Sequence, residues 1–183
     1  MDEAQKILRC SLKYCQTQNS LKSQFCSRCK SPLIQRYLWV LGTGFPAEQI
    51  QQFVAQRYLI ISNKLVLDTR PGLPPYFPER IPPWLKPYLK LSPYRLHIPK
   101  LYGQIPRENL TSSETPELET TDHSDIWLLE YENFSSTVQK QLAKGEFLPT
   151  VDRAWSSTSG NRQLNWLLQI SQLWQPLQVQ GVA

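Results

Sequence analysis

The chain of 183 residues has few glycines and, beyond residue 29, no cysteine. Its 7 glycines against 15 prolines favour rigid turns and extended loops over a helical bundle. No apolar run approaches the roughly 20 residues of a membrane-spanning helix. The first six residues also lack the apolar core of a secretory signal peptide. We therefore expect a cytoplasmic protein that makes no contact with a membrane and has no structural disulfides.

Familiar catalytic patterns are missing as well. Neither an H-R-D nor a D-F-G triplet occurs, and we find no Ser-His-Asp or Cys-His arrangement. The two histidines, His97 and His123, lie far along the chain from the cysteines. Asp68 and Glu130 adjoin apolar runs, where a hydrogen-bonded structural carboxylate is the commoner role. We therefore predict no catalytic residue and no cofactor-binding residue in this chain.

What the chain does have is a cluster of cysteines near its N-terminus. Cys10, Cys15, Cys26 and Cys29 follow the spacing C-x4-C-x10-C-x2-C. Two short-spaced pairs joined by a short loop can place four thiolates around one tetrahedral zinc ion. The alternatives are two disulfides or four unrelated thiols, and disulfides need an oxidising compartment. Four protein ligands leave no open position for water, so the predicted zinc is structural and replaces a core that so short a segment cannot build.

The positive charge is concentrated in the same region. Residues 1–37 hold seven lysines and arginines against two carboxylates, which leaves +5, the whole formal net charge; the remainder is balanced at 13 against 13. Basic residues on a zinc module could contact nucleic-acid phosphates, or they could form an ordinary solvated surface. Phe25 lies between the two cysteine pairs. We expect it to pack beneath the metal and not to stack on a base.

Four runs of aliphatic and aromatic residues predict β-strands. Asn63 and Lys64 separate two of the runs and suit a tight turn, so we expect these runs to form a hairpin. The runs cover residues 35–41, 57–61, 65–68 and 126–131, and residues 96–102 are also expected to be extended.

Two short helices are predicted among the strands. Pro46 suits the first turn of a short helix that would carry Ile50, Phe53 and Val54 on one face. The second helix is predicted over residues 136–144 and ends at Gly145, because glycine is the usual residue after a helix C-terminus.

Two segments differ sharply from the rest in composition. Residues 71–99 hold nine prolines, a density that excludes a long regular element. They are too apolar for a free linker, so we expect an ordered, wrapped segment with one short helix near residues 82–89. A proline-rich ligand for an SH3-type domain is the alternative. Residues 107–125 carry one arginine against six carboxylates and are the expected mobile loop.

The last predicted element is an apolar helix over about residues 161–175, ended by Pro176. Its large side chains recur at helical spacing. We predict that this helix contacts a protein partner, because the chain supplies only part of a surface to cover it. Alternatively, residues 71–99 wrap over the helix and bury it. The stripe consists of Trp166, Ile170, Leu173, Trp174 and Leu177, with Leu164, Leu167 and Leu168 beside it.

The order of these motifs resembles a known family. A four-cysteine prefix followed by residues 57–61 (RYLII) and 65–75 (LVLDTRPGLPP) is similar to the zinc-ribbon-prefixed, kinase-like N-terminal region of cyanobacterial serine/threonine protein phosphatases. The similarity runs through nearly all of the chain. Residues 93–103 resemble the helix-to-strand segment of a kinase N-lobe, residues 126–131 the strand that enters the hinge, and residues 164–183 the first long helix of the C-lobe.

The resemblance implies an α+β fold with two parts. Residues 1–35 would form the zinc ribbon, and residues 36–183 a partial, inactive protein-kinase-like domain with an N-lobe sheet and the start of a C-lobe. The family's metal-dependent phosphatase domain would follow downstream of this chain. The implied function is a non-catalytic regulatory or scaffolding module of such a phosphatase, and a nucleic-acid-binding zinc-ribbon protein is the alternative.

The sequence departs from active kinases at the residues that do the chemistry. Gly42-Thr43-Gly44 is only a G-x-G, and it precedes the kinase-like start. Lys64 falls in a predicted turn and not in a V-A-I-K strand. The resemblance therefore implies a fold and no phosphotransfer.

Overall fold

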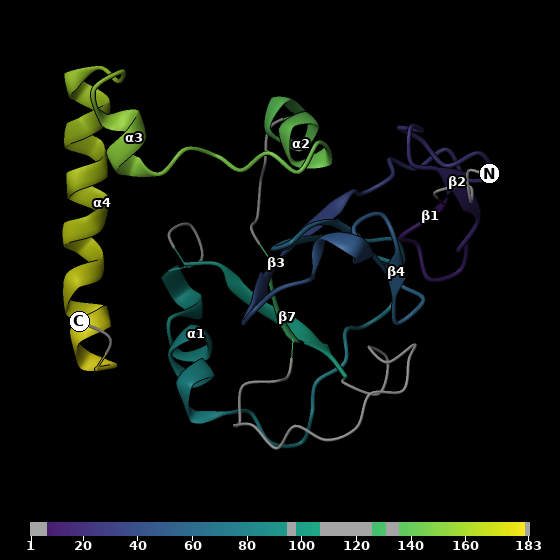
Figure 1. Ribbon diagram of the computed structural model, residues 1–183, viewed down its shortest axis with the longest axis horizontal. Helices are drawn as coiled ribbons and strands as arrows, with labels where there is room; N and C mark the ends of the chain where they lie inside the picture. The colour runs from purple at the N-terminus through teal and green to yellow at the C-terminus, as the bar shows by residue number, and fades with distance from the viewer. Residues whose placement is uncertain (1–6, 95–97, 107–125, 131–135, 182–183) are drawn as a thin grey trace.

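The computed structural model describes residues 7–94, 98–106, 126–130 and 136–181. Within these ranges the chain combines a two-stranded sheet near the N-terminus, a six-stranded sheet in the middle, and helices (Figure 1). This confirms the predicted mixture of helix and sheet. The acidic segment 107–125, predicted to be mobile, lies outside the described residues.

The large sheet is antiparallel, with the strand order β4-β5-β6-β3-β8-β7. Strands β5 and β6 form the predicted hairpin, with Asn63 and Lys64 at its turn. The small sheet pairs β1 (Ile7–Arg9) with β2 (Gln18–Ser20). The strands of the large sheet are β3 (Arg36–Leu41), β4 (Phe53–Val54), β5 (Tyr58–Ser62), β6 (Leu65–Asp68), β7 (Lys100–Ile105) and β8 (Ile126–Glu130).

The large sheet curls around its own core. Val54 on the β4 edge and Tyr102 and Ile105 on the β7 edge belong to one buried cluster. Tyr102 of β7 also donates its hydroxyl to Asp68 of β6 at 2.6 Å, although β8 and β3 lie between these strands. Neighbouring strands lie about 4.8 Å apart, so this contact requires a curled sheet. Leu38 and Val40 on central strand β3 point into the same cluster and are completely buried.

The outer face of the sheet is covered in two halves. On one half, Leu142 of helix α2 (Ser136–Ala143) packs against Leu59 and Leu67. On the other half, Leu85 packs against Trp127, and both side chains are almost completely buried. The sheet therefore has apolar residues on both faces, which explains why its strands read as continuous apolar runs.

The proline-rich segment is ordered where the structure describes it. It contains the one-turn 3-10 helices η2 (Pro83–Leu85) and η3 (Ser92–Tyr94) and, between them, helix α1 (Lys86–Lys90). Leu85 and Leu91 anchor these turns in the protein interior. The prediction of an ordered segment with a short helix near residues 82–89 is confirmed.

The predicted helix after Pro46 is wrong beyond its first turn. Only Ala47–Gln49 forms a 3-10 helix, η1, and Phe53 and Val54 belong to strand β4. Gln51 has a positive φ of 70°, which helical residues do not adopt. The helical spacing of the apolar residues was misleading because the edge of the sheet recruits Val54 into the core.

Helix α2 confirms the second predicted helix and its end. Gly145 has φ +77°, and its N–H donates to the carbonyl of Leu142. The N–H of Glu146 donates to the carbonyl of Gln141. This pair of bonds is a Schellman motif, in which glycine supplies the left-handed residue.

The C-terminal helices lie to one side of the sheet (Figure 1). Helix α3 (Val151–Trp155) packs its Trp155 ring against Trp166 of α4 (Gly160–Val179), with 6.1 Å between the ring centroids. The prediction that Pro176 ends α4 is wrong, since Pro176 lies inside the helix. A proline in the last turn costs one hydrogen bond to the preceding turn, and its fixed φ suits a helix.

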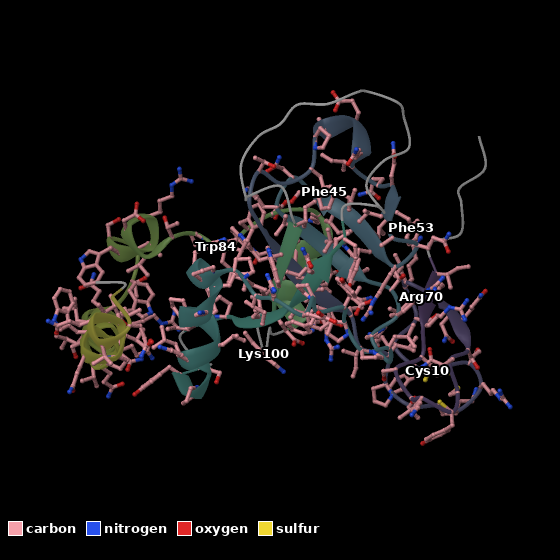
Figure 2. All side chains as sticks on the ribbon, turned by 90° about the horizontal axis from the view of Figure 1, so that it is seen from below. Cys10, Phe45, Phe53, Arg70, Trp84 and Lys100 are labelled. Carbon is pink, nitrogen blue, oxygen red and sulfur yellow. The ribbon has the colours of Figure 1, made fainter. Side chains whose placement is uncertain are left out.

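Helix α4 has no buried residue. The alternative prediction, that residues 71–99 wrap over this helix and bury it, is therefore wrong. In Figure 2 the helix is seen end-on, with side chains projecting around its whole circumference. No helix among the described residues combines the length and the apolar character required to cross a membrane.

Candidate metal centre

Two similar turns carry the four cysteines. Cys10 follows strand β1 directly, and the N–H of Cys15 donates to the carbonyl of Leu12. In the second turn, the N–H of Lys30 donates to the carbonyl of Cys26. The residue after the second cysteine of each turn, Gln16 and Lys30, has a positive φ of 49° and 62° respectively. Each turn therefore folds back so that its two sulfurs face the other turn.

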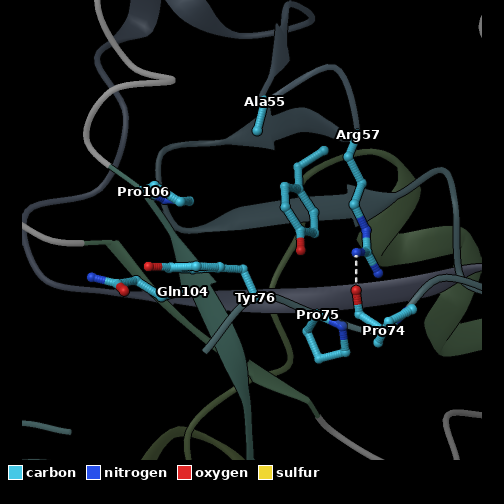
Figure 3. A pocket seen from close by; sticks show the side chains of 8 residues that line it. Ala55, Arg57, Pro74, Pro75, Tyr76, Gln104 and Pro106 are labelled. Carbon is cyan, nitrogen blue, oxygen red and sulfur yellow. Dashed lines mark hydrogen bonds between the residues drawn. The ribbon is translucent and has the colours of Figure 1, made fainter. Parts of the chain in front are cut away.

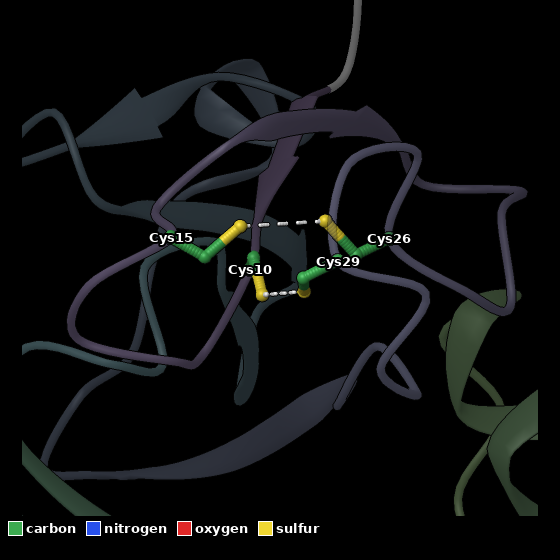
Figure 4. A group of neighbouring side chains, drawn as sticks. All are labelled: Cys10, Cys15, Cys26 and Cys29. Atoms are coloured by element: carbon green, nitrogen blue, oxygen red, sulfur yellow. Dashed lines mark hydrogen bonds between the residues drawn. The ribbon is translucent and has the colours of Figure 1, made fainter.

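The four sulfurs form one compact group (Figure 4). All four Sγ atoms lie within 4.8 Å of one another. The Sγ atoms of Cys10 and Cys29 are 3.6 Å apart, and those of Cys15 and Cys26 are 3.7 Å apart. A tetrahedron with metal–sulfur bonds of about 2.3 Å has sulfur–sulfur edges of about 3.8 Å. A disulfide needs about 2.05 Å, and all four cysteines are free. The group can therefore hold a metal ion.

Both cysteines of the second turn have a pKa below the ordinary value of a thiol. Backbone hydrogen bonding from Cys29, and further from Arg28, lowers the pKa of Cys26 to about 6, although burial acts in the opposite direction. The hydroxyl group of Ser31 is the main cause that lowers the pKa of Cys29. Burial raises the pKa of Cys10. A cysteine ligand must be a thiolate, so the lowered pKa values of Cys26 and Cys29 favour metal binding by the second turn.

Polar side chains around the sulfurs complete the site. The hydroxyl of Ser31 lies 3.0 Å from the Sγ of Cys29, and that of Thr17 lies 3.2 Å from the Sγ of Cys15. The sequence reasoning missed both, although the signal was there: each hydroxyl comes two residues after the second cysteine of its pair. Such groups hydrogen-bond to bound thiolates and fix their orientation.

Asn19 is a third residue that the sequence reasoning missed. It is only 7% exposed. Its Oδ1 accepts a hydrogen bond of 2.8 Å from the N–H of Ser27, and its Nδ2 donates to the carbonyl of Thr17 at 2.8 Å and to the Sγ of Cys26 at 3.7 Å. One amide side chain thus joins the two cysteine turns.

The cysteine module is attached to the large sheet. The N–H of Arg9 donates to the carbonyl of Thr69 at 2.8 Å. A Cβ on Gly72 would lie 2.4 Å from the carbonyl oxygen of Ser11, so the two backbones pass in direct contact. Leu21 packs against the outer core of the sheet. The metal ligands are therefore connected to the sheet by both hydrogen bonds and apolar contact.

The structure overturns the expectation for Phe25. Its side chain is 58% exposed and does not pack beneath the metal ligands. Tyr14, in the first turn, is 83% exposed. The module is too small to bury a phenyl ring in addition to the sulfurs and Leu8, which is completely buried.

Three further residues singled out from the sequence have structural contacts. Asp68 pairs with Arg57, and Glu130 pairs with Arg36 at 2.8 Å, which confirms the role predicted for both carboxylates. The Nζ of Lys64 donates to the carbonyl of Gly42. His97 and His123 lie outside the described residues. In the part of the chain that the structure describes, the four cysteines are the one group of three or more side chains placed to share a metal ion.

No protein-family model, no curated protein and no solved structure matches this chain.

Proposed function

We propose that Cys10, Cys15, Cys26 and Cys29 bind one structural zinc ion, and that the chain is a non-catalytic regulatory or scaffolding module. The observation that carries the proposal is the set of four sulfurs within 4.8 Å of one another. A set of four thiolates is characteristic of structural zinc, because it fills the tetrahedron and leaves no position for water or substrate. Reduced thiols persist in the cytoplasm, which is where the proposal places the protein.

The regulatory part of the proposal rests on the resemblance described above. It assigns residues 36–183 to a degenerate kinase-like domain and the whole chain to the N-terminal part of a serine/threonine protein phosphatase. The contact between Lys64 and Gly42 supports a non-catalytic role. It ties the lysine of the β5–β6 turn to the glycine pair that would otherwise be compared with a phosphate-binding loop.

A regulatory module needs a surface that contacts another protein, and we propose helix α4 for this role. Leu164 and Trp174 are 66% and 62% exposed. Large apolar side chains that are exposed together on one helix are typical of protein interaction sites.

Nucleic-acid binding is the second candidate, and the exposure of Tyr14 and Phe25 favours it. Both rings lie on a module whose Lys13, Lys22 and Arg28 are also exposed. Exposed aromatic rings can stack on bases while neighbouring cations bind phosphates.

Metal analysis tests the proposed zinc site. We expect one zinc per chain in protein purified without chelator, and less than one in Cys15→Ser. Ser27→Ala is the matched control, because Ser27 lies in the second turn and supplies no sulfur. Absence of zinc from the wild-type chain, or full zinc content in Cys15→Ser, would contradict the proposal.

Two assays separate the candidate functions. A phosphotransfer assay with Mg²⁺ or Mn²⁺ should show no turnover, and turnover that Lys64→Ala abolishes would refute the non-catalytic proposal. Binding of single-stranded DNA or RNA is then measured at low and high salt. Salt-sensitive binding that is lost in a Tyr14→Ala, Phe25→Ala double variant would favour the nucleic-acid candidate.

A further inference from the structure

A hollow lies where the two ends of the curled sheet approach each other (Figure 3). Its volume is about 410 Å³, within the usual range for small-molecule sites. Tyr58 of β5 and Gln104 of β7 come from opposite ends of the sheet, and the proline-rich segment supplies the wall between them. The lining of the hollow includes Tyr58, Pro74, Pro75, Tyr76, Gln104 and Pro106.

Two hydrogen bonds fix the position of the proline-rich segment that forms this wall. The Nη1 of Arg57 donates to the carbonyl of Pro74 at 2.7 Å, and the N–H of Gln104 donates to the carbonyl of Tyr76 at 2.9 Å. The segment that forms this wall packs directly against Gly103, because a Cβ there would lie 2.7 Å from the Cβ of Pro75. The hollow is therefore a defined feature of the fold and not a gap between loops.

Two largely buried polar residues line the hollow. Gln104 is 5% exposed and Tyr58 is 3% exposed. Among the described residues, only the Oγ of Ser62 is a fully enclosed side-chain polar atom without a hydrogen-bond partner, so the carboxamide of Gln104 and the hydroxyl of Tyr58 are not orphaned groups. Each can form hydrogen bonds with a ligand that enters the hollow.

None of the described residues that line the hollow carries a free charge. Arg57 lines it, but two nitrogens of its guanidinium group bind the carboxylate of Asp68, each at 2.9 Å. Burial raises the pKa of Tyr58, with Arg57 acting in the opposite direction, so the phenol is neutral at physiological pH. A charged ligand would lose its hydration here without gaining a counter-charge.

We propose that this hollow binds a small uncharged ligand that carries a flat ring and an amide group. The rings of Pro75, Tyr76 and Pro106 offer apolar surface to the ring of the ligand. The carboxamide of Gln104 can both donate to and accept from an amide, and the hydroxyl of Tyr58 can do the same. The proposal is independent of the zinc site and of the function proposed above.

Benzamide is a suitable probe, because it consists of one flat ring and one amide. The zinc-loaded full chain is titrated with benzamide and, separately, with benzoate, and binding is followed by amide chemical shifts in NMR. We expect saturable shifts at Tyr76 and Gln104 with benzamide and none with benzoate. No saturable benzamide shift at these residues, or equal binding of benzoate, would overturn the proposal.

Variants identify the polar groups that bind the probe. Tyr58→Phe keeps the ring and removes the hydroxyl, and Gln104→Leu removes the amide. Each should weaken benzamide binding by about tenfold, the value of one hydrogen bond in a buried site. Tyr37→Phe is the control, because it removes a buried hydroxyl from the other face of the sheet. Unchanged affinity in Tyr58→Phe refutes the proposal, even if Gln104→Leu fails to fold.

Discussion

Arg57 and Asp68 form a bidentate salt bridge beside the β5–β6 hairpin. The Nε and Nη2 atoms of Arg57 each lie 2.9 Å from one oxygen of the Asp68 carboxylate, which is completely buried. Tyr102 also donates its hydroxyl to this carboxylate at 2.6 Å. The same guanidinium group donates to the carbonyls of Leu73 and Pro74. One pair therefore connects the hairpin, strand β7 and the proline-rich segment.

Removing the charge of Asp68 should destabilise the protein strongly. We expect Asp68→Asn to lower the free energy of unfolding by about 3–5 kcal/mol, because it leaves a largely buried guanidinium without its counter-charge. Urea denaturation at neutral pH measures the change. Glu130→Gln is the control, since the Arg36–Glu130 pair is more exposed, with side chains 26% and 16% accessible. Equal losses in the two variants would contradict the special role of Asp68.

Removal of the metal should loosen the contact between the cysteine module and the sheet. The Arg9 N–H is bonded to the carbonyl of Thr69, and metal binding contributes folding free energy to a module of this size. After chelation, we expect hydrogen exchange of the Arg9 amide to become faster, while amides in β8 stay protected. Uniform loss of protection would instead mean that the whole chain unfolds, and unchanged exchange at Arg9 would mean that the module holds its shape without metal.

Gly72→Ala should be destabilising although glycine is usually replaceable. The new Cβ would lie 2.4 Å from the carbonyl oxygen of Ser11 and 2.5 Å from the Nε2 of Gln16. Relief requires one backbone to move, at a cost of about 1–3 kcal/mol. Gly160→Ala is the matched control, since no atom lies within 4 Å of its Cβ position at the start of α4. Thermal unfolding of both variants tests whether contact, and not loss of glycine itself, causes the effect.

The exposed face of α4 predicts concentration-dependent association. Trp174 is 62% exposed, so Trp174→Glu should leave the free energy of unfolding within about 0.5 kcal/mol of wild type. Light scattering should show association of the wild-type chain that this variant reduces. Trp166→Ala is the contrasting variant, because it removes a ring that packs on Trp155 and should destabilise the α3–α4 pair. A wild-type chain that stays monomeric at high concentration would contradict the prediction.

Local sequence patterns correctly predicted those features whose conformation depends on neighbouring residues in the chain. The apolar runs and the Asn63–Lys64 turn predicted the hairpin, and Gly145 predicted the end of α2, because a turn and a left-handed residue are local requirements. The cysteine spacing predicted the sulfur cluster for the same reason.

The failures depended on contacts between distant residues. Val54 joins a strand because the curled sheet has a core for it, and nothing in residues 46–54 records that curl. Phe25 is exposed because the small module has no interior left for it. The sequence predicted a hydrogen-bonded carboxylate at Asp68, but it did not identify Arg57 and Tyr102 as the partners, because both contacts depend on the fold.

The contact between the cysteine module and the sheet bears on how the chain can be divided. Thr69 is bonded to the module, and only three residues separate it from Leu73, whose carbonyl Arg57 holds. Leu21 covers part of the outer core of the sheet. A truncated protein beginning at residue 36 would lose that cover and the anchor on Thr69 together. The amino-acid composition changes at residue 35, but the contacts across this position make it unsuitable as the start of a truncated protein.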